Sequence, residues 1–222
     1  ALPPHMKLKK KVKQNPFFHK YTDLENLKWY GTVFAPGELV TVTEKVHGTN
    51  FRAGWVPWVA STWWDKVRAA LRLAPQWVFV YGSRNVQLSS RLNKTNFYST
   101  NGVAPNVYLE AVQKYGLAHK LPKGVVVFGE VYGSGIQPGY HYGCAQGERK
   151  LALFDAEVIE PDNSYYMCPA EFAKFTADYA LPRVPTLYCG FYDEAIVKMH
   201  TEGASVLAPS QPVREGCVTR PA

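Results

Sequence analysis

Cysteine is scarce in this 222-residue sequence, and long hydrophobic runs are absent. The four cysteines form no Cys-x-x-Cys pair, and so few in a chain of this length do not indicate a disulfide scaffold. No apolar run approaches the roughly 18 residues that are needed to span a bilayer, and the first residues show no signal-peptide pattern. These absences predict a cytoplasmic protein with free thiols and no membrane partner.

Two common signatures of functional sites are also missing. The glycine-rich residues 133–135 are not followed by Gly-Lys-Ser or Gly-Lys-Thr, so a P-loop around nucleotide phosphates is rejected. His119, His141 and His200 show none of the paired spacing that is typical of a metal site.

The sequence does contain a large apolar fraction and an excess of positive charge. Hydrophobic residues make up 46% and aromatic residues 14%, which favours a packed globule of one large domain, with or without an appendage. The formal net charge is +7 and the pI is about 9.1, a balance that favours a polyanionic partner. Many basic proteins bind no polyanion, so charge alone does not assign a function.

The two ends of the chain differ in character. Residues 1–6 resemble a cloning remnant before a native start at Met6, and we exclude them from the fold. Residues 7–17 form a basic N-terminal extension with five lysines between positions 7 and 13, which either contacts nucleic acid or remains a solvated tail. Ordered structure is expected from residue 18.

Alternating and continuous apolar patterns predict one α+β domain of strands flanked by helices. Strands are expected at 38–43, 51–56, 77–81, 125–132 and 149–159, and near 215, with a turn at 161–163. Helices are expected at 105–119, 169–180 and 193–202.

Residues 57–76 interrupt a predicted hairpin. Trp64, Val67 and Leu71 fall at the spacing of one helix face, so we expect an amphipathic helix inserted between two strands. The simpler interpretation packs that face on the body of the protein with the basic residues in water. The alternative is that the aromatic and basic residues stack on RNA.

The most informative stretch is residues 43–50, TEKVHGTN. It places Lys45 where a β-branched strand ends in a turn, so that the amine can project into a cleft while Gly48 allows close approach to the backbone. An amine must be neutral to attack phosphorus, and we expect Lys45 to lie buried beside positive charge. A solvated lysine in a surface hairpin is the alternative interpretation.

Lys-x-His-Gly-Thr-Asn resembles the nucleotide-binding motif of the RNA ligase 2 family of covalent nucleotidyltransferases, found in phages and in RNA-editing ligases. Four further stretches resemble motifs of that family and occur in its order. They are YGSRN at 81–85, VFGEVYG at 127–133, LFDA at 153–156 and REGCVTRP at 214–221.

The resemblance implies an α+β nucleotidyltransferase domain, an ATP-grasp-like fold of mostly antiparallel sheets flanked by helices, in an ATP-dependent RNA ligase that uses Mg²⁺. Lys45 would become adenylylated, and the AMP would pass to an RNA 5′-phosphate before attack by a 3′-hydroxyl. The resemblance assigns nucleotide contacts to Glu44, Val46, His47, Asn50, Glu130 and Phe154, RNA phosphate contacts to Arg52 and Arg84, and a magnesium contact to Glu215, directly or through water.

The expected partner is RNA, most simply a nicked duplex, bound by a monomer in the cytoplasm, which would be that of the host if the protein is phage-encoded. A DNA ligase or capping-type enzyme is disfavoured, because those enzymes usually carry Lys-x-Asp-Gly. The family has a further lysine motif after the Glu-Gly stretch, and the sequence ends at Ala222 without it. Residues 18–222 are therefore expected to be a domain cut before that motif and any C-terminal domain, which leaves an inactive nucleotide- or RNA-binding module as the alternative.

Overall fold

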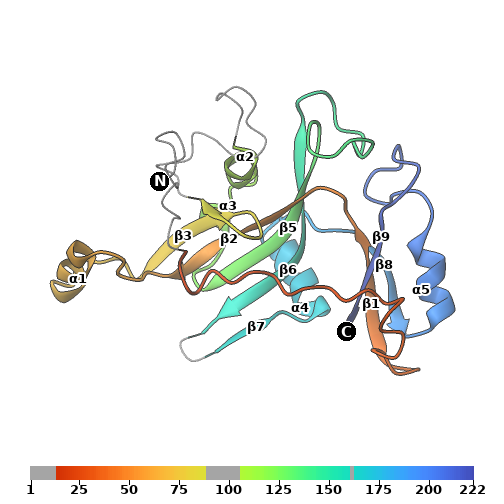
Figure 1. Cartoon of the computed structure of the whole chain (residues 1–222), viewed down its shortest axis with the longest axis horizontal. Coiled ribbons are helices and arrows are strands. Elements are labelled where there is room, and N and C mark those ends of the chain that lie inside the picture. The colour runs from red at the N-terminus through yellow and green to blue at the C-terminus, as the bar shows by residue number, and fades with distance from the viewer. Residues whose placement is uncertain (1–13, 89–105, 161–162) are drawn as a thin grey trace, which may run out of the picture.

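A computed structural model describes residues 14–88, 106–160 and 163–222 of the chain. Within these residues the fold consists of two antiparallel sheets with helices packed around them (Figure 1). The predicted α+β class is thus confirmed. The expected cloning remnant, most of the basic extension, and part of the turn at 161–163 lie outside the described residues.

The larger sheet has six strands in the order β4-β3-β2-β5-β6-β7. Its strands are β2 (Thr49–Pro57), β3 (Trp77–Gly82), β4 (Gln87–Leu88), β5 (Val125–Gly133), β6 (Arg149–Ile159) and β7 (Ser164–Tyr166). The long apolar run of β5 is explained by burial on both faces: Val125 and Val127 belong to one core cluster, whereas Val126 and Phe128 belong to another.

The smaller sheet has three strands, β8-β1-β9. They are β1 (Leu39–Lys45), β8 (Thr186–Phe191) and β9 (Gly216–Pro221), and both outer strands pair antiparallel with β1. Our sequence analysis did not predict β8, whose alternation is interrupted by Gly190. The pairing of β1 with β9 sets Lys45 opposite Gly216, next to Glu215.

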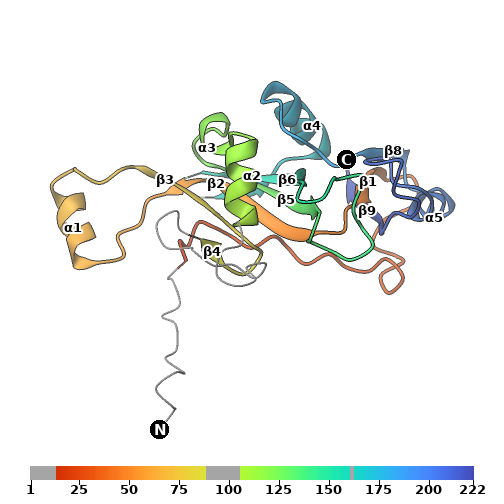
Figure 2. The ribbon, with the colours of Figure 1, turned by 90° about the horizontal axis from the view of Figure 1, so that it is seen from above.

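The helices cover one face of the larger sheet and one side of the smaller one. They are α2 (Val107–Lys114), α3 (Leu117–Lys120), α4 (Pro169–Asp178) and α5 (Glu194–Thr201). The single helix expected at 105–119 is two helices, because Gly116 has a left-handed φ of 65° that breaks the first one. In Figure 2, α2, α3 and α4 lie on one face of the larger sheet, and the N-terminal segment from residue 14 crosses the other face.

The inserted helix, α1 (Trp63–Ala70), forms as expected, but the expected packing of its apolar face is wrong. None of its residues is buried, and Figure 1 shows it projecting from the end of the β2–β3 hairpin, away from the rest of the fold. A Thr62–Asp65 capping box stabilises its first turn. The hairpin is long enough to hold the helix beyond the reach of the core.

In the part of the chain that the structure describes, no helix is both long and apolar enough to cross a membrane.

Candidate active site

A cleft of about 330 Å³ lies where the two sheets meet the N-terminal segment. The smaller sheet contributes residues of β1 and β9, the larger sheet contributes residues of β2, β5 and β6, and residues 21–24 close one side. Nine of the ten predicted site residues line this cleft: Glu44, Lys45, Val46, His47, Asn50, Arg84, Glu130, Phe154 and Glu215.

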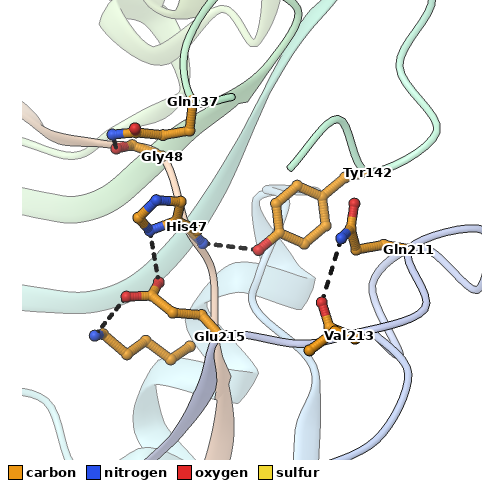
Figure 3. Close-up of polar contacts among 8 residues, drawn as sticks. His47, Gly48, Gln137, Tyr142, Gln211, Val213 and Glu215 are labelled. Carbon is orange, nitrogen blue, oxygen red and sulfur yellow. Dashed lines mark hydrogen bonds and ion pairs between the residues drawn. The ribbon is translucent and has the colours of Figure 1, made fainter. Parts of the chain in front are cut away.

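Lys45 is the last residue of β1, and its amine meets the carboxylate of Glu215, which directly precedes the neighbouring strand β9. Its Nζ lies 2.6 Å from Oε1 of Glu215, and the ring Nδ1 of His47 lies 3.2 Å from the other carboxylate oxygen (Figure 3). The side chain of Lys45 is 50% exposed. The expectation that Lys45 is buried is therefore wrong, and its amine lies beside the carboxylate of Glu215, which precedes β9.

The turn after Lys45 is held by the segment that connects β5 and β6. The backbone N–H of His47 donates to the Tyr142 hydroxyl at 2.8 Å, and Gln137 donates to the carbonyl of Gly48 at 2.9 Å (Figure 3). Gly48 is required sterically, since a Cβ there would lie 2.3 Å from the carbonyl oxygen of Val131. These contacts fix the chain direction as it leaves one sheet for the other.

Glu130 lies on β5, opposite Asn50 of β2. Burial raises the pKa of Glu130 to about 8, and the nearby charge of Glu215 adds to the rise, whereas Lys45 and the backbone N–H of Gly48 oppose it. At neutral pH this carboxyl group is mostly protonated and can both donate and accept a hydrogen bond. Oδ1 of Asn50 is buried without a partner among the described residues, so this pair offers polar atoms to a ligand.

Glu44 has a structural partner in addition to its place at the cleft. Its side chain is 1% exposed, and its carboxylate accepts hydrogen bonds from the Ser205 hydroxyl and from the backbone N–H groups of Val206 and Leu207. The carboxylate thus anchors the 205–208 turn to β1.

The opposite wall of the cleft is apolar. Phe154 on β6 is partly buried and packs edge-on against Tyr21, with ring centroids 5.0 Å apart. Val46, Val184 and Val218 complete this wall. An aromatic ring beside aliphatic groups provides the flat apolar surface on which a base can stack.

Two predicted phosphate contacts have different locations. Arg84 lines the cleft and pairs with Asp23, and its side chain is 43% exposed, so its guanidinium is accessible to an anionic ligand. Arg52, in contrast, is completely buried and does not line the cleft.

The guanidinium of Arg52 has structural partners. It donates to the carbonyls of Phe18, His19 and Ser83 at 2.6–2.9 Å, and burial lowers its pKa to about 10, which leaves it charged at neutral pH. We therefore assign it the role of holding the N-terminal segment on the sheet, not that of binding RNA.

A family model described as RNA ligase matches residues 38–222, most of the chain. The chain belongs to the RNA ligase family. The match spans the smaller sheet, the larger sheet and every residue of the Lys45 turn, so it covers the whole cleft except residues 21–24. A search of curated protein sequences found no match.

Solved RNA ligases share the fold. A lysine-to-alanine variant of Naegleria gruberi RNA ligase with ATP and Mn has 18% sequence identity and a TM-score of 0.65, over 94% of this chain and 54% of that one. The Naegleria gruberi RNA ligase with PPi has 17% identity and a TM-score of 0.64, over 100% and 58%. The present chain thus spans about half the length of these ligases.

A buried polar cluster borders the cleft, and the sequence analysis assigned no role to two of its members, Tyr21 and Arg220, which line the cleft. Asp155 of β6 accepts a hydrogen bond from the Tyr21 hydroxyl at 2.8 Å and pairs with Arg220 of β9. Burial raises the pKa of Asp155, although Arg220 and Tyr21 counteract it. A basic residue in an otherwise apolar strand was the available signal at Arg220, since buried charges are nearly always paired.

The cleft fits a divalent cation only in part. No group of three or more His, Cys, Asp or Glu side chains that could hold a metal ion occurs among the described residues. Magnesium is commonly bound through one or two carboxylates together with substrate phosphates and water. The charge of Glu215 contributes to the raised pKa of Glu130, and a cation near both would favour the ionised form of Glu130.

Proposed function

We propose that this chain carries the adenylylation site of an ATP-dependent RNA ligase, which joins RNA 5′-phosphate and 3′-hydroxyl ends through a lysyl-AMP intermediate. The observation that carries the proposal is the position of Lys45, whose amine projects from a strand end into a cleft and lies 2.6 Å from Glu215. Membership of the RNA ligase family supports the same chemistry.

In the first step, the lone pair of the Lys45 amine attacks the α-phosphorus of ATP. A phosphorus–nitrogen bond forms as the bond to the bridging oxygen breaks, and pyrophosphate leaves with that electron pair. The amine must first lose a proton, and the Glu215 carboxylate is positioned to accept it. AMP then remains attached to Lys45.

The adenylate would be held by the residues around the amine. The base stacks on Phe154, and the Glu130–Asn50 pair faces the ribose hydroxyls, where a mostly protonated Glu130 both donates and accepts. His47 would lie beside the phosphates, since its ring and the amine of Lys45 both contact the carboxylate of Glu215. Magnesium would be held by Glu215 with Glu130 nearby, and it would neutralise phosphate charge when bound.

Transfer to RNA then requires a site for the 5′-phosphate. Arg84 is accessible at the edge of the cleft and presents a planar fork of donors suited to phosphate oxygens. The RNA phosphate would displace Asp23 from it. The net charge of +7 favours approach of a nicked duplex, and because one chain lines the whole cleft we expect a monomer to act.

The test is covalent labelling. The purified chain is incubated with α-³²P-ATP and Mg²⁺ and then denatured, and we expect a label that survives denaturation in the wild type and is lost in Lys45→Ala. Lys150→Ala is the control, because Lys150 lies on β6 outside the cleft. A label retained by Lys45→Ala would refute the assignment.

Nucleotide binding without any covalent label in the wild type would support the alternative of a binding module without turnover. Isothermal titration with ATP separates that outcome from a chain that binds no nucleotide. The substrate is then identified by joining assays on nicked RNA, nicked DNA and single-stranded RNA, with nicked RNA expected to be joined fastest.

A further inference from the structure

Helix α1 carries large apolar side chains, yet none of its residues is buried. Trp63 and Trp64 are 61% and 62% exposed, and their ring centroids lie 3.8 Å apart. Leu71, just after the helix, is 62% exposed. Such a group of large exposed apolar side chains marks an interaction surface more often than chance exposure does.

Positive charge borders this apolar group on both sides. At about 100° per residue, Trp63, Val67 and Trp64 fall within an arc of roughly 100°, and Lys66 and Arg68 flank it. The one acid of the helix, Asp65, is occupied, because its carboxylate accepts hydrogen bonds from Ser61 and Thr62 in the cap. The surface therefore presents aromatic faces between two cations, and with Asp65 included the helix carries a net charge of +1.

This combination suits unpaired RNA better than a duplex or an apolar protein partner. Unpaired bases stack on aromatic side chains while cations contact the flanking phosphates. A duplex keeps its bases stacked internally and would leave the tryptophans unused. An apolar partner would leave Lys66 and Arg68 without counter-charges.

The position of α1 sets its distance from the cleft, where the RNA ends would be joined. Asn50, near the start of β2, lines the cleft, and Pro57, at its end, leads into the insertion. The seven steps from Asn50 to Pro57, at about 3.3 Å each, span roughly 23 Å, and α1 begins beyond Pro57. A stacked RNA strand covers that distance in about seven nucleotides, at roughly 3.4 Å per nucleotide, so α1 lies at least that far from the cleft.

We propose that α1 is a second RNA-binding surface, on which Trp63 and Trp64 stack with unpaired nucleotides that extend beyond the duplex around the joined ends, at least seven positions from the reacting end. Lys66 and Arg68 contact the phosphates on either side. The inference rests on the proposed function for the identity of RNA as the substrate.

The test measures affinity against RNA length by fluorescence anisotropy, with 5′-phosphorylated single strands of 5 and 20 nucleotides. We expect Trp63→Ala/Trp64→Ala to weaken binding of the 20-mer roughly tenfold and to leave the 5-mer, which cannot reach α1, unchanged. Lys66→Ala/Arg68→Ala should lower the slope of log K against log salt by about 1.4 on the 20-mer.

Matched controls exist elsewhere on the surface. Trp29→Ala removes another exposed tryptophan, and Lys174→Ala/Lys198→Ala removes two cations from other helices; neither should change RNA binding. Because no residue of α1 is buried, its variants should keep the wild-type melting temperature. They should also keep Lys45 labelling by ATP, so that a failure of this inference is distinguishable from a failure of the proposed function.

Three results would overturn the inference. The first is unchanged affinity of the tryptophan variant for the 20-mer, and the second is an equal loss on both RNAs. The third is unchanged RNA affinity together with a tryptophan-dependent loss of binding to vesicles of phosphatidylserine and phosphatidylcholine, which would identify α1 as a membrane-binding element.

Discussion

The amine of Lys45 and the carboxylate of Glu215 lie 2.6 Å apart although 170 positions separate them in the sequence. The contact exists because β1 and β9 pair antiparallel, with Lys45 opposite Gly216. The amine of Lys45 is therefore held by an acid, and under the proposed function the approach of phosphates must reorganise this pair.

Replacing Glu215 tests that pairing. Glu215→Gln keeps the shape of the side chain but removes its charge and its ability to accept a proton. We expect the rate of Lys45 labelling at saturating ATP to fall at least ~100-fold, measured by rapid quench. Glu194→Gln, which removes a surface carboxylate paired with Lys198, should label at the wild-type rate; an equal fall in both variants would contradict the assignment.

The raised pKa of Glu130 predicts that the stability of the protein depends on pH. Its pKa rises from 4.5 to about 8 on folding, so the folded state binds the proton more tightly than the unfolded state. The free energy of unfolding from this group is therefore highest below pH 4.5 and falls as the pH rises to about 8.

Glu130→Gln removes this dependence. At pH 8.5 we expect a melting temperature at least ~3 °C above that of the wild type, with little difference near pH 4, as measured by scanning calorimetry. The same variant should bind ATP more weakly. A stability difference that does not change with pH would show that Glu130 titrates normally.

Gly48→Ala tests the close approach of the Lys45 turn to β5. The added methyl group would lie 2.3 Å from a backbone oxygen of Val131 and 2.8 Å from Cγ of Glu130. Overpacking of this kind costs about 1–3 kcal/mol of stability, and the shifted turn should abolish Lys45 labelling. Gly31→Ala is the control, since its nearest neighbour lies at 3.9 Å, and urea unfolding of both variants measures the difference.

Variants of Arg52 and Arg84 test which of the two arginines stabilises the fold and which one binds RNA. Arg52→Lys cannot satisfy the same carbonyls and should destabilise the fold by about 2–4 kcal/mol, with little change in RNA affinity at temperatures where it remains folded. Arg84→Lys should leave stability unchanged and slow transfer of AMP to RNA roughly tenfold. Loss of RNA affinity in stable Arg52→Lys protein would restore the phosphate role expected from the sequence.

Local patterns were sufficient to predict much of this fold. Residues 149–159 form β6 as expected, and the strand before the lysine was placed correctly because β-branched residues alternate there. The family motifs also identified residues that meet in one cleft, although nothing local indicates that Glu215 contacts Lys45 and His47.

Features that depend on distant partners escaped prediction. Arginine in a motif suggests phosphate binding, but the carbonyls that surround Arg52 come from residues 18, 19 and 83, and only tertiary structure reveals them. The amphipathic pattern of α1 predicted burial, yet the hairpin carries the helix away from the core. Hydrophobic periodicity specifies a face but not whether a partner is present.

The topology of the smaller sheet has a consequence during synthesis. Strand β1 is the middle strand, and both of its neighbours, β8 and β9, come from the last quarter of the sequence. At about 5–20 residues per second, the ribosome needs roughly 10–30 s to produce them after β1 emerges. Throughout that interval the strand bearing Lys45 lacks both of its neighbouring strands and its acidic partner, so the cleft cannot form in a nascent chain until β9 has been made.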